Sequence, residues 1–147
     1  MMKMRKTGLR LETSYRKEKD QPREKWKCGY VKLFRYDKQV VNSEFCITET
    51  SLWVSWLETK PHFRKCGYAR LVIDYYKGVC TILGIPLFLN SLEEAVGFYE
   101  KLGFKEVITI KEKFRVIENK DYVWDVYDYV WLPPSLRRKR KIWVHGF

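Results

Sequence analysis

The residues best placed to do chemistry lie in one short stretch, which consists of Arg64, Lys65, Cys66, Gly67, Tyr68 and Ala69. A strand is predicted before this stretch and a helix after it. The first turn of a helix presents unpaired amides and a partial positive charge, which suits a phosphate group. Gly67 lets the backbone approach a ligand closely. The stretch predicts a phosphate-binding or pyrophosphate-binding loop, with an ordinary strand-to-helix turn as the alternative.

The elements on either side of this loop are predicted from apolar periodicity. Residues 30–36, 40–47 and 52–59 alternate apolar and polar positions between polar turns, which indicates three antiparallel strands. From Ala69 to Leu83 the apolar residues recur at helical spacing, and Gly84 follows as a helix stop. The wholly apolar residues 86–89 indicate a strand buried between two layers. The loop therefore joins a strand to the main helix.

The remaining elements complete an order of strands, helix, strand, helix and strands. Residues 4–11 are predicted as a first strand and residues 12–27 as one charged surface helix. Ser91 precedes Glu94 by three residues, as in a capping box, and predicts a helix through about Lys101. Residues 105–110 and 121–132 alternate as two further strands. The prolines at 133 and 134 then end the fold.

Composition indicates one globular domain. The chain has 147 residues, of which 46% are hydrophobic and 16% aromatic, enough to repay the entropy of folding. No window approaches the roughly eighteen consecutive apolar residues of a membrane span, and no leader is evident. We therefore expect a cytoplasmic protein without a membrane partner. The expected domain is 1–134, followed by a basic and aromatic tail at 135–147.

Cysteine and histidine spacing gives no sign of a metal site. The four cysteines, at positions 28, 46, 66 and 80, show no paired short spacing, and the chain has two histidines. A chain of this size folds without disulfides. We therefore expect four free thiols and no metal.

The charge of the chain favours a polyanionic partner. It carries 29 basic and 18 acidic residues, a net charge of +11, and part of the excess is a run from Arg137 to Lys141. A nucleic-acid-binding module using its aromatic residues as stacking platforms is one alternative function. It is not favoured, because most aromatic residues fall on alternating strand positions, where core packing explains them. The aromatic tail, residues 142–147, is a candidate surface for a homodimer.

Two motifs identify a family resemblance. Residues 57–69, in which Arg64, Gly67 and Ala69 are the fixed positions, resemble motif A of the GNAT N-acetyltransferase superfamily. Residues 95–104 are similar to motif B of that family, in which an alanine, an aromatic residue and Tyr99 precede the pair Gly103 and Phe104. The motifs stand in the family's order, joined by a helix and a buried strand. The resemblance covers residues 30–110.

The resemblance implies an α/β (α+β) fold, with a mixed, mostly antiparallel twisted sheet flanked by helices and a reduced N-terminal helical region. The central strands 52–59 and 86–89 would splay apart and hold acetyl-CoA between them. Backbone groups near Leu57 and Thr59 would meet the pantetheine and acetyl groups. The amides of residues 66–70 would meet the pyrophosphate. The implied cofactor-binding residues are Leu57, Thr59, Arg64, Lys65, Cys66, Gly67, Tyr68, Ala69, Arg70, Asn90 and Lys101.

The implied reaction is direct attack of a primary amine, on a protein, peptide or small molecule, on the acetyl thioester. Tyr99 matches the family's general acid, although its ring also suits core packing. Trp53 occupies the place of a strand carboxylate found in several members, and Leu92 that of an asparagine. Strand alternation places Trp53 and Ser55 on the face of Leu57 and turns Glu58 away, which disfavours Glu58 as base. A protein that binds acyl-CoA without turnover is the second alternative.

Overall fold

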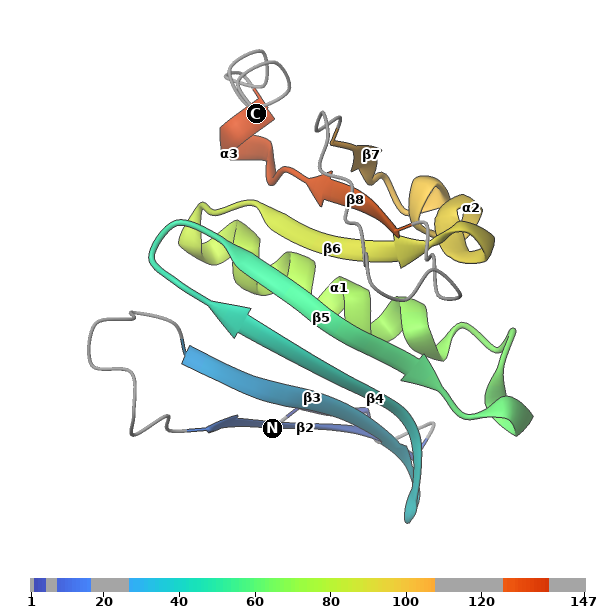
Figure 1. Cartoon of the computed structure of the whole chain (residues 1–147). Helices are drawn as coiled ribbons and strands as arrows, with labels where there is room; N and C mark the ends of the chain where they lie inside the picture. Colours follow the sequence, from blue (N-terminus) through green and yellow to red (C-terminus); the bar gives the residue numbers. More distant parts are fainter. Residues whose placement is uncertain (1, 5–7, 17–26, 108–125, 138–147) are drawn as a thin grey trace, which may run out of the picture.

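A computed structural model describes residues 2–4, 8–16, 27–107 and 126–137, which form one sheet with helices packed on it (Figure 1). The eight strands of this part lie in the order β1-β2-β3-β4-β5-β6-β8-β7. The strands are β1 Met2–Met4, β2 Leu9–Arg16, β3 Lys27–Arg35, β4 Lys38–Ile47, β5 Leu52–Thr59, β6 Leu87–Leu92, β7 Lys105–Glu106 and β8 Val126–Trp131. The helices are η2 Pro61–Phe63, α1 Tyr68–Leu83, η3 Glu93–Ala95, α2 Val96–Lys101 and α3 Pro134–Arg137.

Neighbouring strands are antiparallel except for β5 and β6, which pair in parallel. A parallel pair needs a crossover connection, and α1 supplies it between these two strands. The fold is therefore the mixed, mostly antiparallel sheet that the family resemblance implies. Helix α1 ends where expected, at Gly84, whose φ of 69° is left-handed.

The main core lies between α1 and one face of the sheet. The buried side of α1, with Val72, Ile73, Tyr76 and Cys80, packs against that face. The sheet contributes the buried residues Val31, Leu33, Val41, Leu52, Val54, Leu87 and Leu89. A second cluster lies on the opposite face, where the ring of Trp53 stacks on that of Phe88 at 4.4 Å between centroids.

One polar pair lies inside the main core. The Ser43 hydroxyl donates to the Val31 carbonyl over 2.7 Å and lies 2.6 Å from the Tyr76 hydroxyl. Because the single Ser43 proton is used on Val31, Tyr76 is the donor in the second bond. Burial raises the pKa of Tyr76, so its hydroxyl stays protonated. This chain of bonds ties α1 to β3 and β4.

The N-terminal prediction was wrong in part. Residues 2–16 contain two strands, and the first five residues of the predicted helix 12–27 continue β2. Pairing with β3 along residues 9–16 explains this, because it places Leu9 and Leu11 in the core with period-two spacing. Residues 17–26 of the predicted helix lie outside the described residues.

The capping box at Ser91 was also wrong. β6 runs on to Leu92 because its last residues pair with β8, and the Ser91 hydroxyl donates to the Leu92 carbonyl over 2.8 Å. A 3-10 turn, Glu93–Ala95, then leads into α2. Of the last two predicted strands, β7 and β8 are seen, while residues 108–125 lie outside the described part of the chain.

The start of the predicted tail packs on the domain. Helix α3 begins at Pro134, and Arg137 Nε donates to the Leu132 carbonyl over 2.9 Å. The Arg137 guanidinium also lies 5.5 Å from the centre of the Trp131 ring. Arg137 therefore contacts the domain, whereas residues 138–147, with most of the basic run, lie outside the described residues.

The expectation of four free thiols was wrong. Cys28 and Cys46 form a disulfide between β3 and β4, where they are directly opposed in the strand register. Cys66 is free and exposed, and Cys80 is free and buried. Sequence spacing did not show the pair, because opposed strand positions are set by the register of the hairpin.

The described residues contain no group of three or more His, Cys, Asp or Glu side chains able to hold a metal ion. None of their helices is long and apolar enough to cross a membrane.

Candidate active site

The sheet opens between β5 and β6. The two strands pair only at Leu52 with Leu87, Trp53 with Phe88 and Val54 with Leu89. Beyond these positions β5 continues along β4 and β6 continues along β8 (Figure 1). The facing edges, residues 55–59 and 90–92, have no strand partner among the described residues. The predicted splay is therefore present, and it leaves backbone donors and acceptors available to a ligand.

A bulge at Ser55 decides which side chains face α1. Glu44 pairs with Trp56 and Phe45 with Val54, so Ser55 is an extra residue in β5. The bulge reverses the alternation beyond it. Leu57 and Thr59 consequently share the α1 face with Val54.

The opposite face carries a different set of side chains. Trp53 lies on it, which corrects the expectation that Trp53 shares a face with Leu57, because that expectation assumed unbroken alternation. Trp56 and Glu58 follow on the same face, opposite Glu44 and Asn42. Glu58 does lie away from Leu57, as predicted. Trp56 is 52% exposed.

The loop after β5 is held by its own polar contacts. Arg64 Nε donates to the Thr59 carbonyl over 3.1 Å, and the Cys66 thiol lies 3.5 Å from the Arg64 carbonyl. Lys65 and Gly67 both adopt left-handed backbone, with φ of 64° and 81°. A Cβ atom at Gly67 would meet no atom of the other described residues within 4 Å. The backbone conformation, rather than packing against neighbouring described residues, therefore favours glycine here.

Five consecutive amides at the start of α1 form no hydrogen bond within the described residues. The first helical bond is from the Leu71 amide to the Gly67 carbonyl, at 3.3 Å. Within the described part of the chain, the amides of residues 66–70 have no acceptor. Arg64, Lys65 and Arg70 add three exposed cations around them. This arrangement suits a pyrophosphate.

Two side chains of this helix start have partners within the domain. Tyr68 accepts a hydrogen bond from Arg35 Nη1 over 3.1 Å, so its hydroxyl points toward the β3–β4 hairpin. Arg70 lies 4.0 Å from the Asp74 carboxylate one turn along α1. For Tyr68 and Ala69, the backbone amides are therefore the groups available to a ligand.

Tyr99 lies on α2 and is buried in the main core cluster. The centre of its ring lies 5.0 Å from the centre of the Phe98 ring and 5.8 Å from that of the Phe104 ring. Burial raises the pKa of Tyr99 to about 12, so the phenol is protonated at neutral pH. No hydrogen bond of its hydroxyl is formed with another described residue. Tyr99 thus combines core packing with a hydroxyl that can donate a proton.

Two other predicted cofactor residues, Asn90 and Lys101, lie on β6 and α2, away from the loop that precedes α1. Asn90 is the first residue of β6 beyond the three positions that pair with β5, and its Nδ2 donates to Asp128 Oδ1 on β8. This bond directs the side-chain amide toward β8. Lys101 is exposed in the last turn of α2.

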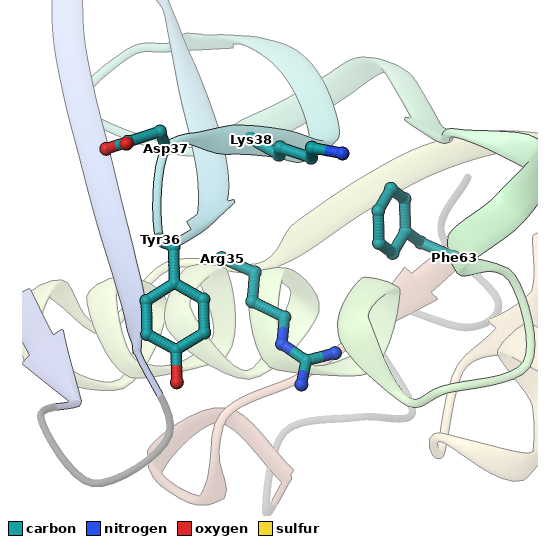
Figure 2. Close-up of a pocket in the computed structure, with 5 residues that line it drawn as sticks. All are labelled: Arg35, Tyr36, Asp37, Lys38 and Phe63. Carbon is teal, nitrogen blue, oxygen red and sulfur yellow. The ribbon is translucent and has the colours of Figure 1, made fainter.

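A hollow of about 390 Å³ lies beside the helix start, between the β3–β4 hairpin and η2 (Figure 2). None of the predicted cofactor residues lines it, and Lys38 points across it toward Phe63. Local sequence patterns do not reveal it, because its walls come from two segments that meet only in the fold. The lining residues are Arg35, Tyr36, Asp37, Lys38 and Phe63.

Comparison with known proteins identifies the family. The profile of the acetyltransferase (GNAT) domain matches residues 23–106. Uncharacterized N-acetyltransferases of Bacillus thuringiensis (strain Al Hakam) and Bacillus cereus (strain AH820) are 30% identical over 94 residues, 64% of this chain and 53% of theirs. The chain spans about half the length of these curated relatives.

Solved structures share the fold. The ribosomal-protein-S18-alanine N-acetyltransferase of Escherichia coli superposes with a TM-score of 0.61 at 15% identity, over 84% of this chain and 94% of its own. Arabidopsis thaliana Naa50, in complex with the bisubstrate analogue CoA-Ac-MVNAL, gives 0.58 at 18% identity, over 69% and 71%. Bacillus subtilis YlbP, in complex with coenzyme A, gives 0.50 at 18% identity, over 71% and 67%. Since the family profile matches more than half of the chain, this protein belongs to the GNAT acetyltransferase family.

Proposed function

We propose that the chain transfers the acetyl group of acetyl-CoA to a primary amine. The observation that carries the proposal is the opening between β5 and β6, which leads directly into the unpaired amides at the start of α1. An extended pantetheine can hydrogen-bond to the free edge of β5 as a further strand would. The pyrophosphate then meets the amides of residues 66–70. The pantetheine and the pyrophosphate of one ligand would thus meet hydrogen-bonding partners one after the other along the opening.

The residues proposed to hold acetyl-CoA follow from this arrangement. Leu57 and Thr59 supply backbone groups along β5, while Arg64, Lys65 and Arg70 neutralise phosphate charge. Asn90, at the β6 edge of the opening, and Lys101, an exposed cation in the last turn of α2, complete the proposed set. The complex with coenzyme A reported for YlbP, and the CoA-containing analogue bound to Naa50, support a CoA ligand for this fold.

In the proposed reaction the amine nitrogen attacks the thioester carbonyl, forming the C–N bond. The C–S bond then breaks, and the departing thiolate takes a proton. Tyr99 is the proposed acid, because its raised pKa keeps it protonated at neutral pH. The amine nitrogen loses one proton as the C–N bond forms, and in this proposal solvent water accepts it. Glu58 remains disfavoured as the base because it lies on the face opposite Leu57. One proton leaves the nitrogen and one reaches the sulfur, so the reaction balances.

Peptide N-termini are the first acceptors to test. The Escherichia coli structural neighbour is named for an alanine of ribosomal protein S18, and the Naa50 analogue carries the sequence MVNAL. Lysine side chains and small amines complete the acceptor panel.

Two experiments separate this proposal from its alternatives. Acetyl-CoA at a hundredfold excess over its dissociation constant should stabilise the fold by about 2.7 kcal/mol, whereas DNA and RNA should not. Stabilisation by nucleic acid alone would favour the binding module. Release of free CoA, measured with the acceptor panel, then distinguishes an enzyme from a protein that only binds acyl-CoA.

A further inference from the structure

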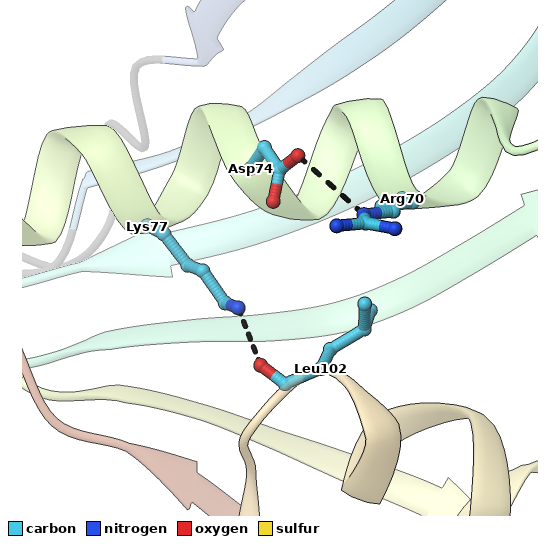
Figure 3. A network of polar contacts seen from close by, with 4 residues as sticks. All are labelled: Arg70, Asp74, Lys77 and Leu102. Carbon is cyan, nitrogen blue, oxygen red and sulfur yellow. Dashed lines mark hydrogen bonds and ion pairs between the residues drawn. The ribbon is translucent and has the colours of Figure 1, made fainter.

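Lys77 of α1 reaches the end of α2. Its Nζ donates to the carbonyl of Leu102, the residue that follows α2 (Figure 3). The same ammonium group lies 5.2 Å from the centre of the Trp131 ring and 5.7 Å from that of Phe104. Lys77 therefore contacts three segments at once: the end of α2, the residue before β7, and β8.

Backbone hydrogen bonds at the end of α2 converge on the Tyr99 carbonyl. The amides of Leu102 and Phe104 both donate to the Tyr99 carbonyl, at 3.0 and 3.1 Å, and the Gly103 amide donates to the Glu100 carbonyl at 3.0 Å. None of these three bonds uses the Leu102 carbonyl. That carbonyl accepts its hydrogen bond from Lys77, on another helix. Phe104, which Lys77 contacts, also packs edge-on against the Tyr99 ring.

Helix α2 needs such outside contacts. It has six residues, too few for a helix to be stable without tertiary packing. One other tether is the bond from the Tyr129 hydroxyl to Glu100 Oε2, at 3.0 Å. Lys77 and Tyr129 thus hold the helix at positions on both sides of Lys101.

We propose that Lys77 is a positioning residue for acetyl transfer, which fixes the end of α2 and thereby the place of the Tyr99 hydroxyl relative to the opening between β5 and β6. This inference rests on the proposed function, in which Tyr99 protonates the thiolate. Lys77 acts through the helix and does not itself contact the reacting atoms.

The surroundings of Lys77 fit a hydrogen-bond donor held in place. Burial lowers its pKa, Asp74 opposes that effect, and Arg70 and Arg137 add to the lowering. Either charge state of the amine keeps protons that can be donated to the Leu102 carbonyl. The hydrogen bond from Lys77 to the Leu102 carbonyl therefore does not depend on the charge state of Lys77.

The kinetic test replaces Lys77 by an uncharged residue of similar length. We expect Lys77→Met to lower kcat for CoA release by about tenfold or more, because small displacements of a catalytic group are costly. The KM for acetyl-CoA should stay within about twofold of the wild-type value. Lys77→Arg should restore most of the rate, since it returns a donor. The matched control is Lys105→Met, the same replacement at an exposed lysine of β7, which should leave both constants unchanged.

A double-mutant cycle with Tyr99→Phe shows whether Lys77 acts through Tyr99. In the Tyr99→Phe background, Lys77→Met should change the rate by less than about twofold, because no acid remains to be misplaced. Losses that multiply would overturn the proposal. Lys77→Leu, which also lacks a side-chain donor, serves as the second variant if Lys77→Met does not fold.

Hydrogen exchange tests the tether without any acceptor. In Lys77→Met the amides of residues 102–104 should exchange about tenfold faster, while those of α1 and of Lys105→Met stay as in the wild type. Unchanged exchange at 102–104 would overturn the role of Lys77. Absence of CoA release from the wild-type protein would instead overturn the proposed function, so the two failures are distinguishable.

Discussion

Alanine substitutions at the two ends of α1 separate cofactor binding from helix stability. Gly67 precedes the helix and Gly84 follows it, with left-handed φ values of 81° and 69°. Among the described residues, an added Cβ meets nothing within 4 Å at Gly67 and only Ser135 Oγ, at 3.9 Å, at Gly84. The cost of each substitution is therefore the backbone conformation alone.

That cost is about 1–2 kcal/mol for an L-residue in the left-handed region. For a chain of this size it corresponds to a fall in Tm of about 2–8 °C, similar for Gly67→Ala and Gly84→Ala. The two variants should differ in ligand affinity. Alanine at 67 places a methyl group beside the unpaired amides of residues 66–70, so the Kd for CoA should rise about tenfold, equivalent to 1.4 kcal/mol. Gly84→Ala should keep the wild-type Kd.

Thermal unfolding without ligand and calorimetric titration with CoA measure the two effects separately. Equal Kd values for Gly67→Ala and the wild type would refute the assignment of this loop to the pyrophosphate. An equal rise in Kd for Gly67→Ala and Gly84→Ala would show that strain in α1, and not contact with the ligand, weakens binding.

Three further predictions concern the acid, the core and the disulfide. Tyr99→Phe should slow CoA release about a hundredfold. Because burial raises the pKa of Tyr99 from 10.0 to about 12, the unfolded chain loses this proton first, and the wild-type free energy of unfolding should fall between those pH values. Denaturant titrations should show a shallower fall for Tyr99→Phe; an equal slope would contradict the shift. Ser43→Ala should lower the free energy of unfolding by about 2–3 kcal/mol and Tyr76→Phe by about 1 kcal/mol, as measured by chemical denaturation. The difference arises because only Ser43→Ala leaves a buried donor, the Tyr76 hydroxyl, without an acceptor. Thiol titration of the unfolded protein should count two thiols before reduction and four after, and reduction should cost about 3 kcal/mol of stability; four thiols at the outset would exclude the bond between Cys28 and Cys46.

Local patterns in the sequence predicted the elements that frame the site. The predicted bounds 52–59 match those of β5, although the bulge at Ser55 breaks the alternation within it, and the helical spacing up to Gly84 matches α1. These patterns are predictive because burial places apolar residues at a short, regular spacing. The spacing is about two residues in a strand and about 3.6 residues in a helix. The two motifs, around Gly67 and Tyr99, indicated the family for the same reason: each lies within about a dozen consecutive residues.

The features that the sequence alone did not determine all depend on pairing between distant segments. The bulge at Ser55, which changes the face of Leu57, exists only in the register of β5 against β4. The bond between Cys28 and Cys46 depends on the register of the neighbouring hairpin. Ser91 lies in a strand because β8 pairs with it, and Lys77 holds α2 across 25 residues of chain. The sequence by itself determined the strand, the loop and the helix that frame the opening between β5 and β6. Tertiary structure decided which side chains face that opening and what holds Tyr99, because register and contact between distant segments leave no mark on local periodicity.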